Sequence, residues 1–224
     1  MSNPFHVKLL FSAKEKVEAL CQQKVDVGFI LDSSGSLRNE YTKEKDFLKA
    51  MAAQFDVGKS AQVGVITFSY YTELSIKMNQ YNNINDLSKA VDDIPLMGST
   101  TRIDKALRQA QSDMFAIKNG GRFGVNKVLI LLTDGSQTQD VGAEDPADIA
   151  GEIRKQGINM MTVGIGPGVN STELARIAGG KKNVYQAESF DVLIGKTFLE
   201  SVTKAGCEKG TSNLFILFRF IQNW

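Results

Sequence analysis

The sequence predicts an α/β domain: a doubly wound, mostly parallel six-stranded sheet with one antiparallel edge strand and helices on both faces. Three observations predict this fold class. Apolar runs of strand length alternate along the chain with segments of helical periodicity. Several of the runs are apolar throughout, as in strands buried on both faces. One pair of runs is joined only by Ser69-Tyr70-Tyr71, which is too short for a parallel crossover and indicates an antiparallel pair.

Six strands are expected, and they differ in character. The first is a continuous apolar run, the second is rich in β-branched residues, the third follows across the short link, and the fourth is the most apolar of all. The fifth and sixth follow later helical segments and complete the alternation. In chain order the predicted strands are Val25–Leu31, Gln62–Phe68, Thr72–Lys77, Lys127–Leu132, Asn159–Val163 and Asn183–Gln186.

Six helices are expected between and after these strands. In the first, the side chains from Phe47 to Phe55 include apolar residues at helical spacing on one face. The fourth has Asp145 as its N-cap and Pro146 at its first position, and the fifth ends at Gly179-Gly180. In chain order the predicted helices are Glu40–Phe55, Ile84–Ile94, Arg102–Phe115, Pro146–Lys155, Ser171–Ala178 and Phe190–Thr203.

Composition narrows the classes of function. The chain has 224 residues, of which 42% are hydrophobic and 23% charged, with a net charge of +1, so no basic stripe points to nucleic acid. The one histidine, His6, lies near the start, which argues against a histidine base and against a His-rich zinc site. The apolar run Leu214–Ile221 is too short to cross a bilayer and is interrupted by Arg219, so no membrane insertion is expected.

Two cysteines bracket the periodic part of the chain. Cys21 and Cys207 could be free thiols of a cytosolic protein. Because the pair brackets the domain, we expect instead a disulfide that joins the domain ends in an oxidising compartment. We expect an extension at residues 1–20, a domain at 21–207 and a poorly ordered tail at 208–224. No signal peptide is visible, which suggests a fragment if the protein is secreted. Asn170-Ser171-Thr172 is a glycosylation sequon.

The chemistry-bearing residues follow the first strand. In Asp32-Ser33-Ser34-Gly35-Ser36, one carboxylate and two hydroxyls alternate, so Asp32, Ser34 and Ser36 can converge above the strand end. Oxygen-only ligands suit a hard cation, Mg²⁺ before Ca²⁺, and exclude zinc on softness grounds. The same residue types are also ordinary turn and cap residues, so this loop alone does not decide between the two interpretations.

Two further loops favour a site. Thr133-Asp134-Gly135 supplies a second carboxylate after another strand, and Gly98-Ser99-Thr100-Thr101 presents hydroxyls before a helix. In open α/β sheets the ligand site lies beyond the carboxyl ends of the strands, at the topological switch point. All three loops are therefore expected to meet at one edge.

The three loops together resemble the von Willebrand factor A family. The resemblance rests on residues 29–36, 98–101 and 131–135, is supported by Val63–Phe68 and Val163–Gly166, and is nearest to matrilins and non-fibrillar collagens. It covers residues 21–207, with the two cysteines matching the family's flanking pair. It implies a Rossmann-like fold and a metal-ion-dependent adhesion site. The implied metal ligands are Asp32, Ser34, Ser36, Thr101 and Asp134.

The resemblance also implies a mechanism and a setting. A partner's Asp or Glu carboxylate would take an open coordination position on Mg²⁺, or on Mn²⁺ or Ca²⁺. Specificity would come from four rim residues, Leu37, Arg38, Asn39 and Gln137. The expected partner is an extracellular matrix protein such as collagen, or a second copy of the chain, and the expected location is the extracellular matrix.

Competing functions remain at this stage. Haloacid-dehalogenase-type phosphatases place a second Asp two residues after the first, but this chain has Ser34 there and so lacks the general acid, and an enzyme is not expected. An intracellular A domain is favoured by the absent signal peptide and opposed by the cysteines. A structural matrix module that assembles with copies of itself is the third alternative.

Overall fold

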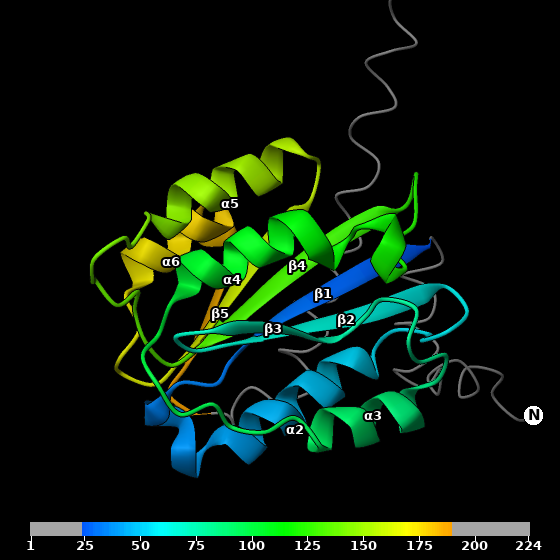
Figure 1. The fold of residues 1–224 in the computed structure, drawn as a ribbon, viewed down its shortest axis with the longest axis horizontal. Coiled ribbons are helices and arrows are strands. Elements are labelled where there is room, and N and C mark those ends of the chain that lie inside the picture. The colour runs from blue at the N-terminus through cyan, green and yellow to red at the C-terminus, as the bar shows by residue number, and fades with distance from the viewer. Residues whose placement is uncertain (1–23, 190–224) are drawn as a thin grey trace, which may run out of the picture.

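Residues 24–189, which the computed structural model describes, form a six-stranded sheet with the strand order β3-β2-β1-β4-β5-β6 (Figure 1). Only β3 runs antiparallel to its neighbour, at the edge of the sheet. The predicted fold class is therefore confirmed. The strands are β1 (Val25–Asp32), β2 (Ala61–Phe68), β3 (Thr72–Ile76), β4 (Asn126–Thr133), β5 (Asn159–Ile165) and β6 (Val184–Ala187).

The strand order creates a switch point at the centre of the sheet. The chain moves from β1 outward through β2 to β3, then returns to place β4 on the other side of β1 and continues to β6. β1 pairs in parallel with both β2 and β4, so its carboxyl end at Asp32 lies between theirs. The loops after β1 and β4 leave from adjacent strand ends, which is the location where open α/β sheets bind ligands.

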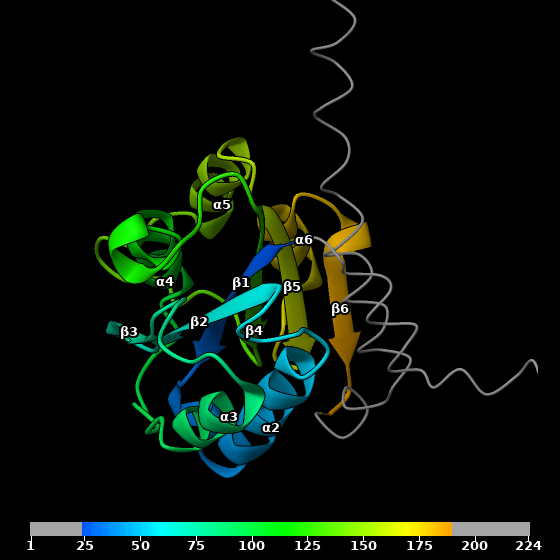
Figure 2. The same ribbon diagram turned by 90° about the vertical axis from the view of Figure 1, so that its right-hand side faces the viewer.

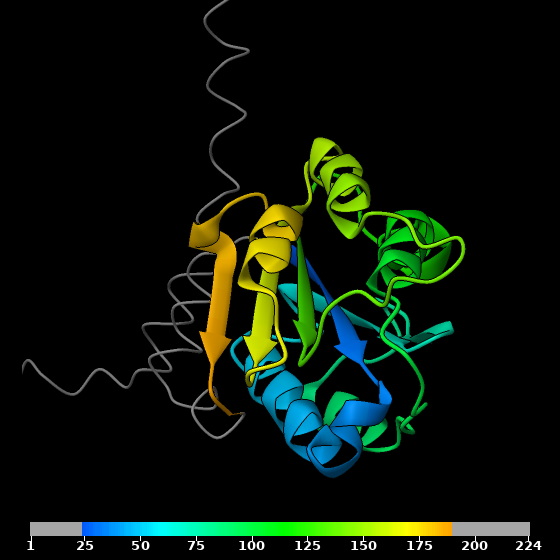
Figure 3. The same ribbon diagram turned by 90° about the vertical axis from the view of Figure 1, so that its left-hand side faces the viewer.

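Two helical layers cover the faces of the sheet. Helices α2 and α3 lie on one face and α4, α5 and α6 on the other (Figures 1 and 2), and Figure 3 shows α6 beside β5 and β6. Alternate residues of β1 serve the two layers: Phe29 and Leu31 pack toward α2, whereas Ile30 packs toward α4. The helices are α2 (Tyr41–Ala52), α3 (Ile84–Asp92), α4 (Ile103–Gln109), α5 (Pro146–Lys155) and α6 (Ser171–Ala178).

The predicted helix Arg102–Phe115 is only partly α-helical. Helix α4 ends at Gln109, and a π turn over Ala110–Met114 follows it. This turn places Met114 against two glycines that face each other on β1 and β2, Gly28 and Gly64. A Cβ atom on Gly28 would stand 2.9 Å from Met114 Cγ, and one on Gly64 would stand 3.0 Å from Met114 Sδ. The absence of side chains at these positions makes room for Met114.

Short turns and a buried ion pair complete the frame. Three 3-10 turns, Gly35–Asn39, Ile117–Asn119 and Lys181–Asn183, connect the larger elements. At the amino end of β1, the carboxylate of Asp26 is buried and accepts hydrogen bonds from the backbone N–H and the Nε of Arg122, both at 2.7 Å. This pair holds the chain before β4 against the start of β1.

Several expectations fall on residues outside 24–189: the helix Phe190–Thr203, the cysteines at 21 and 207, the extension at 1–20 and the tail at 208–224. Over the described range, none of the helices has the length and apolar character that a membrane span requires.

We expect Gly28→Val to destabilise the domain by about 1–3 kcal/mol, because the new side chain must displace Met114 and Leu129 from a packed core. Urea unfolding followed by circular dichroism measures this. Gly151→Ala in α5 is the matched control: its Cβ meets nothing nearer than 3.7 Å, so we expect no loss, and a gain of up to about 1 kcal/mol from helix propensity. Equal unfolding midpoints for both variants would contradict the packing argument.

Candidate metal centre

Asp32 is the last residue of β1 and is fully buried at the switch point. Its Oδ1 accepts a hydrogen bond from the backbone N–H of Ser34 at 2.9 Å, and its Oδ2 accepts one from the Thr133 hydroxyl at 2.6 Å. Thr133 ends β4, so the two central strands jointly fix this carboxylate. The role of Thr133 was not predicted, although its place beside Asp134 at a strand end was a signal.

Three more of the predicted ligands join Asp32 through hydroxyl groups. The Ser34 and Ser36 hydroxyl oxygens are 3.0 Å apart, and the Ser36 hydroxyl donates to Asp134 Oδ1 at 2.9 Å. The oxygens of the first and third loops are therefore within hydrogen-bond distance of one another, as the loop placement predicted. Ser36 is exposed, so this cluster is open to solvent on one side.

The second loop is tied to the first through its backbone. Ser33 O accepts from Gly98 N and Ser99 O accepts from Gly35 N, both at 2.8 Å, and the Ser33 hydroxyl accepts from Met97 N at 2.7 Å. These bonds hold the two loops side by side. Ser33 therefore positions the loop that carries Thr101, a role the sequence analysis did not assign.

Thr101 sits between the second and third loops. It exchanges two bonds with Thr138: Thr138 N donates to Thr101 O at 2.8 Å, and Thr101 N donates to the Thr138 hydroxyl at 3.2 Å. The Thr101 hydroxyl is 3.7 Å from the place a Cβ would occupy on Gly135. The structure thus brings Thr101 next to the third loop, but no hydrogen bond joins its hydroxyl to the other four predicted ligands within the described chain.

A buried ion pair locks the second and third loops together. Arg102 forms a bidentate pair with Asp104 at 2.8 and 2.6 Å, and donates to Asp140 Oδ1 at 2.7 Å. Gln137 Nε2 donates to Asp104 Oδ1 at 2.8 Å, and Gln137 Oε1 accepts from Asp104 N at 3.1 Å. Because each group in this buried cluster has a partner, the loops that carry Thr101 and Asp134 are held in one arrangement.

Glu44 is the most informative residue that the sequence analysis missed. It lies on α2 and is fully buried, with Oε1 accepting from Asp32 N at 3.2 Å and Oε2 without a hydrogen-bond partner in the described structure. A signal was present, because Glu44 is three residues from Tyr41 and Phe47 on the buried face of a helix. The Glu44 carboxyl is thus a second buried acidic group, in contact with the backbone of Asp32.

The electrostatics favour a bound cation. Burial raises the pKa of Asp32 to about 6, despite the lowering effect of the Thr133 and Ser34 hydrogen bonds. Burial, and then the negative charge of Asp32, raise the pKa of Glu44 well above its ordinary value. Burial also raises the pKa of Asp134. Among residues 24–189, no cationic side chain is one of the main groups that act on these three carboxyls, so an ion at this end of the sheet would supply the charge they lack.

The donor set fits a hard divalent ion. It has two carboxylates and three hydroxyls, all oxygen, which is the chemistry that Mg²⁺ and Ca²⁺ prefer. Residues 24–189 contain no group of three or more His, Cys, Asp or Glu side chains arranged for a metal. The proposed site has only two carboxylates and takes its other three donors from hydroxyl groups, so it is not a group of that type.

The four predicted rim residues divide into two pairs. Arg38 and Asn39 are exposed beside Ser36, where a partner can reach them. Leu37 is 1% exposed and Gln137 is 6% exposed. The expectation that these two side chains face a partner is wrong, because Leu37 packs into the core and Gln137 is bound to Asp104.

Comparison with known proteins agrees with this fold. A family model of the von Willebrand factor type A domain matches residues 26–200. The human collagen alpha-6(VI) chain is 34% identical over 178 residues, which cover 79% of this chain and 8% of the collagen chain. The von Willebrand factor A domain-containing protein 2 of Xenopus laevis is 30% identical over 195 residues, covering 86% of this chain and 24% of the relative. The chain therefore spans under a quarter of either relative.

A solved structure is also similar. Proximal thread matrix protein 1 from the mussel byssus superposes with a TM-score of 0.77 at 28% identity, covering 84% of this chain and 49% of the mussel chain. A second structure of that protein, with a TM-score of 0.74 at 30% identity over 84% of this chain and 46% of the mussel chain, has a zinc-occupied MIDAS motif. Zinc occupancy in that protein shows that softness alone does not exclude zinc from such a motif.

We expect the metal-free domain to lose stability as the pH rises from 5 to 7. The pKa of Asp32 in the folded state, about 6, lies above the ordinary value of 3.8, so the folded state binds this proton more tightly. The resulting stabilisation is complete below about pH 4 and is lost as the pH rises through 6, on the order of 2–3 kcal/mol in all. About half of this total falls between pH 5 and pH 7, and urea unfolding in EDTA at these two pH values measures that part.

Asp32→Asn is the control for this pH dependence, because it keeps the shape of the side chain without the titrating proton. We expect the variant to retain only the part contributed by Glu44 and Asp134, whose pKa values shift in the same direction. Identical pH profiles for the wild-type domain and Asp32→Asn would show that Asp32 is not the responsible group.

Proposed function

Since the chain belongs to the von Willebrand factor type A domain family, we propose that it is an extracellular adhesion module that binds an acidic side chain of a partner protein through a divalent cation. The proposed ligands are Asp32, Ser34, Ser36, Thr101 and Asp134. One observation carries the proposal: oxygen donors from the first and third loops gather around a buried carboxylate, and none of the described groups that shift the pKa of that carboxylate is cationic.

The division of roles follows from position. Asp32, buried and held by Thr133 and Ser34, supplies the fixed negative charge at the base of the site. Ser34 and Ser36 add neutral oxygens, and the Ser36 hydroxyl also orients Asp134. A bound cation would act as a Lewis acid that bridges the domain to a carboxylate of the partner. With five protein donors, a six-coordinate ion keeps at least one position for that carboxylate.

Mg²⁺ is the ion we propose, because hard oxygen donors suit it, with Mn²⁺ or Ca²⁺ as the alternatives. The zinc reported in the mussel protein's motif makes Zn²⁺ an ion to include in any titration. Calorimetric titration of the metal-free domain with each of the four ions would rank them.

The partner we propose is an extracellular matrix protein such as a collagen. Support comes from the relatives, which include collagen VI chains and another protein named for its A domain. A second candidate is a structural module that binds copies of itself, and the name of the mussel relative, a thread matrix protein, favours it. We propose no catalytic role: between residues 24 and 189 the chain has no histidine or cysteine to serve as base or nucleophile.

The test is binding of the purified domain to immobilised matrix proteins, collagens included, in Mg²⁺ and in EDTA. We expect binding only in Mg²⁺ and its loss in Asp32→Ala, because that variant removes the buried carboxylate at the base of the site. Asp56→Asn is the control, since this exposed carboxylate precedes β2 and so lies at the amino ends of the parallel strands, away from the proposed ligands. Its binding should equal that of the wild-type domain.

Two outcomes would contradict the proposal. Binding that survives both EDTA and Asp32→Ala would refute the metal bridge. Self-association by sedimentation that is unaffected by EDTA would then favour the structural module. Circular dichroism of Asp32→Ala confirms that a loss of binding does not reflect unfolding.

A further inference from the structure

Asn170 is an exposed residue whose side chain uses only one of its two polar atoms. It is the N-cap of α6, where Oδ1 accepts hydrogen bonds from Thr172 N at 3.0 Å and Glu173 N at 3.1 Å. Among residues 24–189 its Nδ2 forms no hydrogen bond, whereas the Ser171 hydroxyl is bound to Gln186 on β6. The amide nitrogen of the sequon is thus free while the amide oxygen fixes the side chain.

The sequon lies beside the third loop of the metal centre. A Cβ on Gly168, two residues before Asn170, would stand 2.5 Å from the carbonyl oxygen of Asp134. The carboxylate of Glu173, three residues after it, accepts from Gln137 N at 3.1 Å. The segment that carries Asn170 therefore packs on the loop that carries Asp134. Both lie at the carboxyl ends of the parallel strands, where the proposed ligands lie (the metal edge), on the side of β5 and β6.

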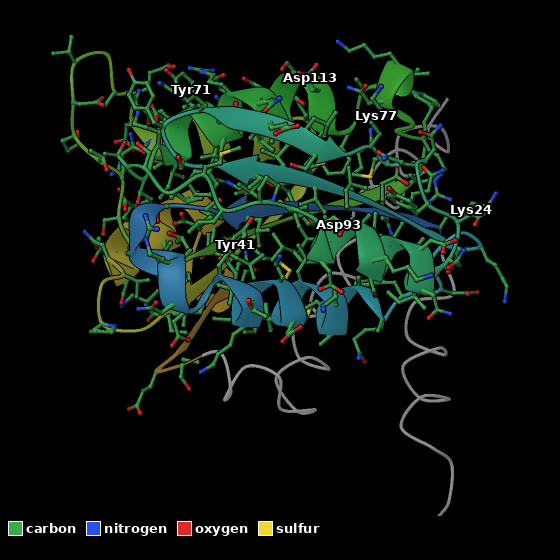
Figure 4. All side chains as sticks on the ribbon, turned by 60° about the horizontal axis from the view of Figure 1, so that its bottom comes forward. Lys24, Tyr41, Tyr71, Lys77, Asp93 and Asp113 are labelled. Atoms are coloured by element: carbon green, nitrogen blue, oxygen red, sulfur yellow. The ribbon has the colours of Figure 1, made fainter. Side chains whose placement is uncertain are left out.

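An aromatic pair lies on the other side of the same end of the sheet. Tyr70 and Tyr71 join β2 to β3 and form an edge-to-face pair with centroids 5.0 Å apart, and Lys105 Nζ lies 3.7 Å from the Tyr70 ring centre. Tyr71 is 74% exposed. Figure 4 shows it at the same end of the sheet as Tyr41 and opposite Lys24.

The link between β2 and β3 is bonded to the metal loops. Phe68 O accepts from Ser33 N at 2.7 Å, and Ser69 O accepts from Arg102 N at 3.0 Å. These two donors are the residues next to Asp32 and Thr101, so the aromatic pair is held at a fixed position relative to the proposed ligands. Exposed, rigid aromatic side chains of this kind are the usual anchors of protein interfaces.

We propose that Asn170 carries an N-linked glycan that covers the β5–β6 side of the metal edge, and that the partner docks from the β2–β3 side, on Tyr70 and Tyr71. This rests on the proposed extracellular function. In the modification, Asn170 Nδ2 bonds to C1 of the sugar of a lipid-linked oligosaccharide pyrophosphate; the C1–O bond to phosphate breaks, the lipid pyrophosphate leaves, and Nδ2 loses a proton. The modification leaves Asn170 Oδ1 unchanged, so this oxygen can accept the capping bonds from Thr172 N and Glu173 N in the glycosylated chain.

The glycan is tested by expressing the full chain through the secretory pathway of a eukaryotic cell and measuring its mass before and after peptide N-glycosidase. We expect a glycan-sized loss of mass in the wild-type chain and in Thr172→Ser, which keeps the sequon. Thr172→Ala removes the sequon without touching the Asn170 side chain, so it should show no loss. A secreted wild-type chain without the mass shift would overturn the glycan.

The docking side is tested with the same glycosylated protein on immobilised collagens in Mg²⁺. We expect Tyr71→Ala to weaken binding roughly tenfold. Phe123→Ala is the matched control, since Phe123 is 94% exposed and precedes β4, at the amino ends of the parallel strands. This variant should bind as the wild-type chain does. Equal affinities of the two variants would overturn the docking side.

The outcomes separate this inference from the proposed function. Mg²⁺-dependent binding that Tyr71→Ala leaves unchanged refutes the docking side alone. Wild-type chain that binds no collagen in either Mg²⁺ or EDTA counts against both the proposed function and the docking side. The glycan depends on neither result, because the mass shift decides it.

Discussion

The buried carboxylate of Asp32 is the constraint on which the rest of the metal edge depends. It lies at the end of the central strand, where the strand order reverses, and so it is close to loops from both halves of the sheet. Thr133 from β4 and the backbone of Ser34 hold its two oxygens, and Glu44 from α2 accepts its backbone N–H. Burial of an acidic group without a cationic side chain is costly, and the raised pKa expresses that cost.

The loops around Asp32 form one rigid unit. Ser33 bonds the first loop to the second, and Thr138 bonds the third to Thr101. Arg102 and Asp104, a buried ion pair, bond to Asp140 and Gln137 of the third loop. A buried pair of this kind adds little net stability, because desolvation offsets the attraction, but breaking it leaves a charge without a partner. We therefore interpret Arg102 and Asp104 as residues that specify the arrangement of the loops, which is what a multidentate site requires.

Sequence patterns predicted the fold and the grouping of the loops, because alternation of apolar strands and helices determines an open α/β sheet. They predicted exposed side chains for Leu37 and Gln137, which are buried, since burial of a loop side chain depends on contacts distant in sequence. Gln137 is buried because it pairs with Asp104, 33 positions earlier. The π turn at Ala110–Met114 was missed because it arises from packing on Gly28 and Gly64, not from local propensity. Helical spacing alone predicts the burial of Glu44, because this residue is three positions from both Tyr41 and Phe47 on the buried face of α2.

The charge at this edge also couples ion and partner. Asp32, Asp134 and the buried Glu44 lie within electrostatic range of one another, because Asp134 raises the pKa of Asp32 and both raise the pKa of Glu44. A partner carboxylate that approached this group without a cation would add another negative charge to a poorly solvated cluster. Under the proposed function, a cation would remove that penalty and so strengthen partner binding, and by thermodynamic linkage the partner would strengthen cation binding by the same factor. On that proposal, the ionised carboxylates of a metal-free site would repel the acidic side chain that the metal-loaded site would bind.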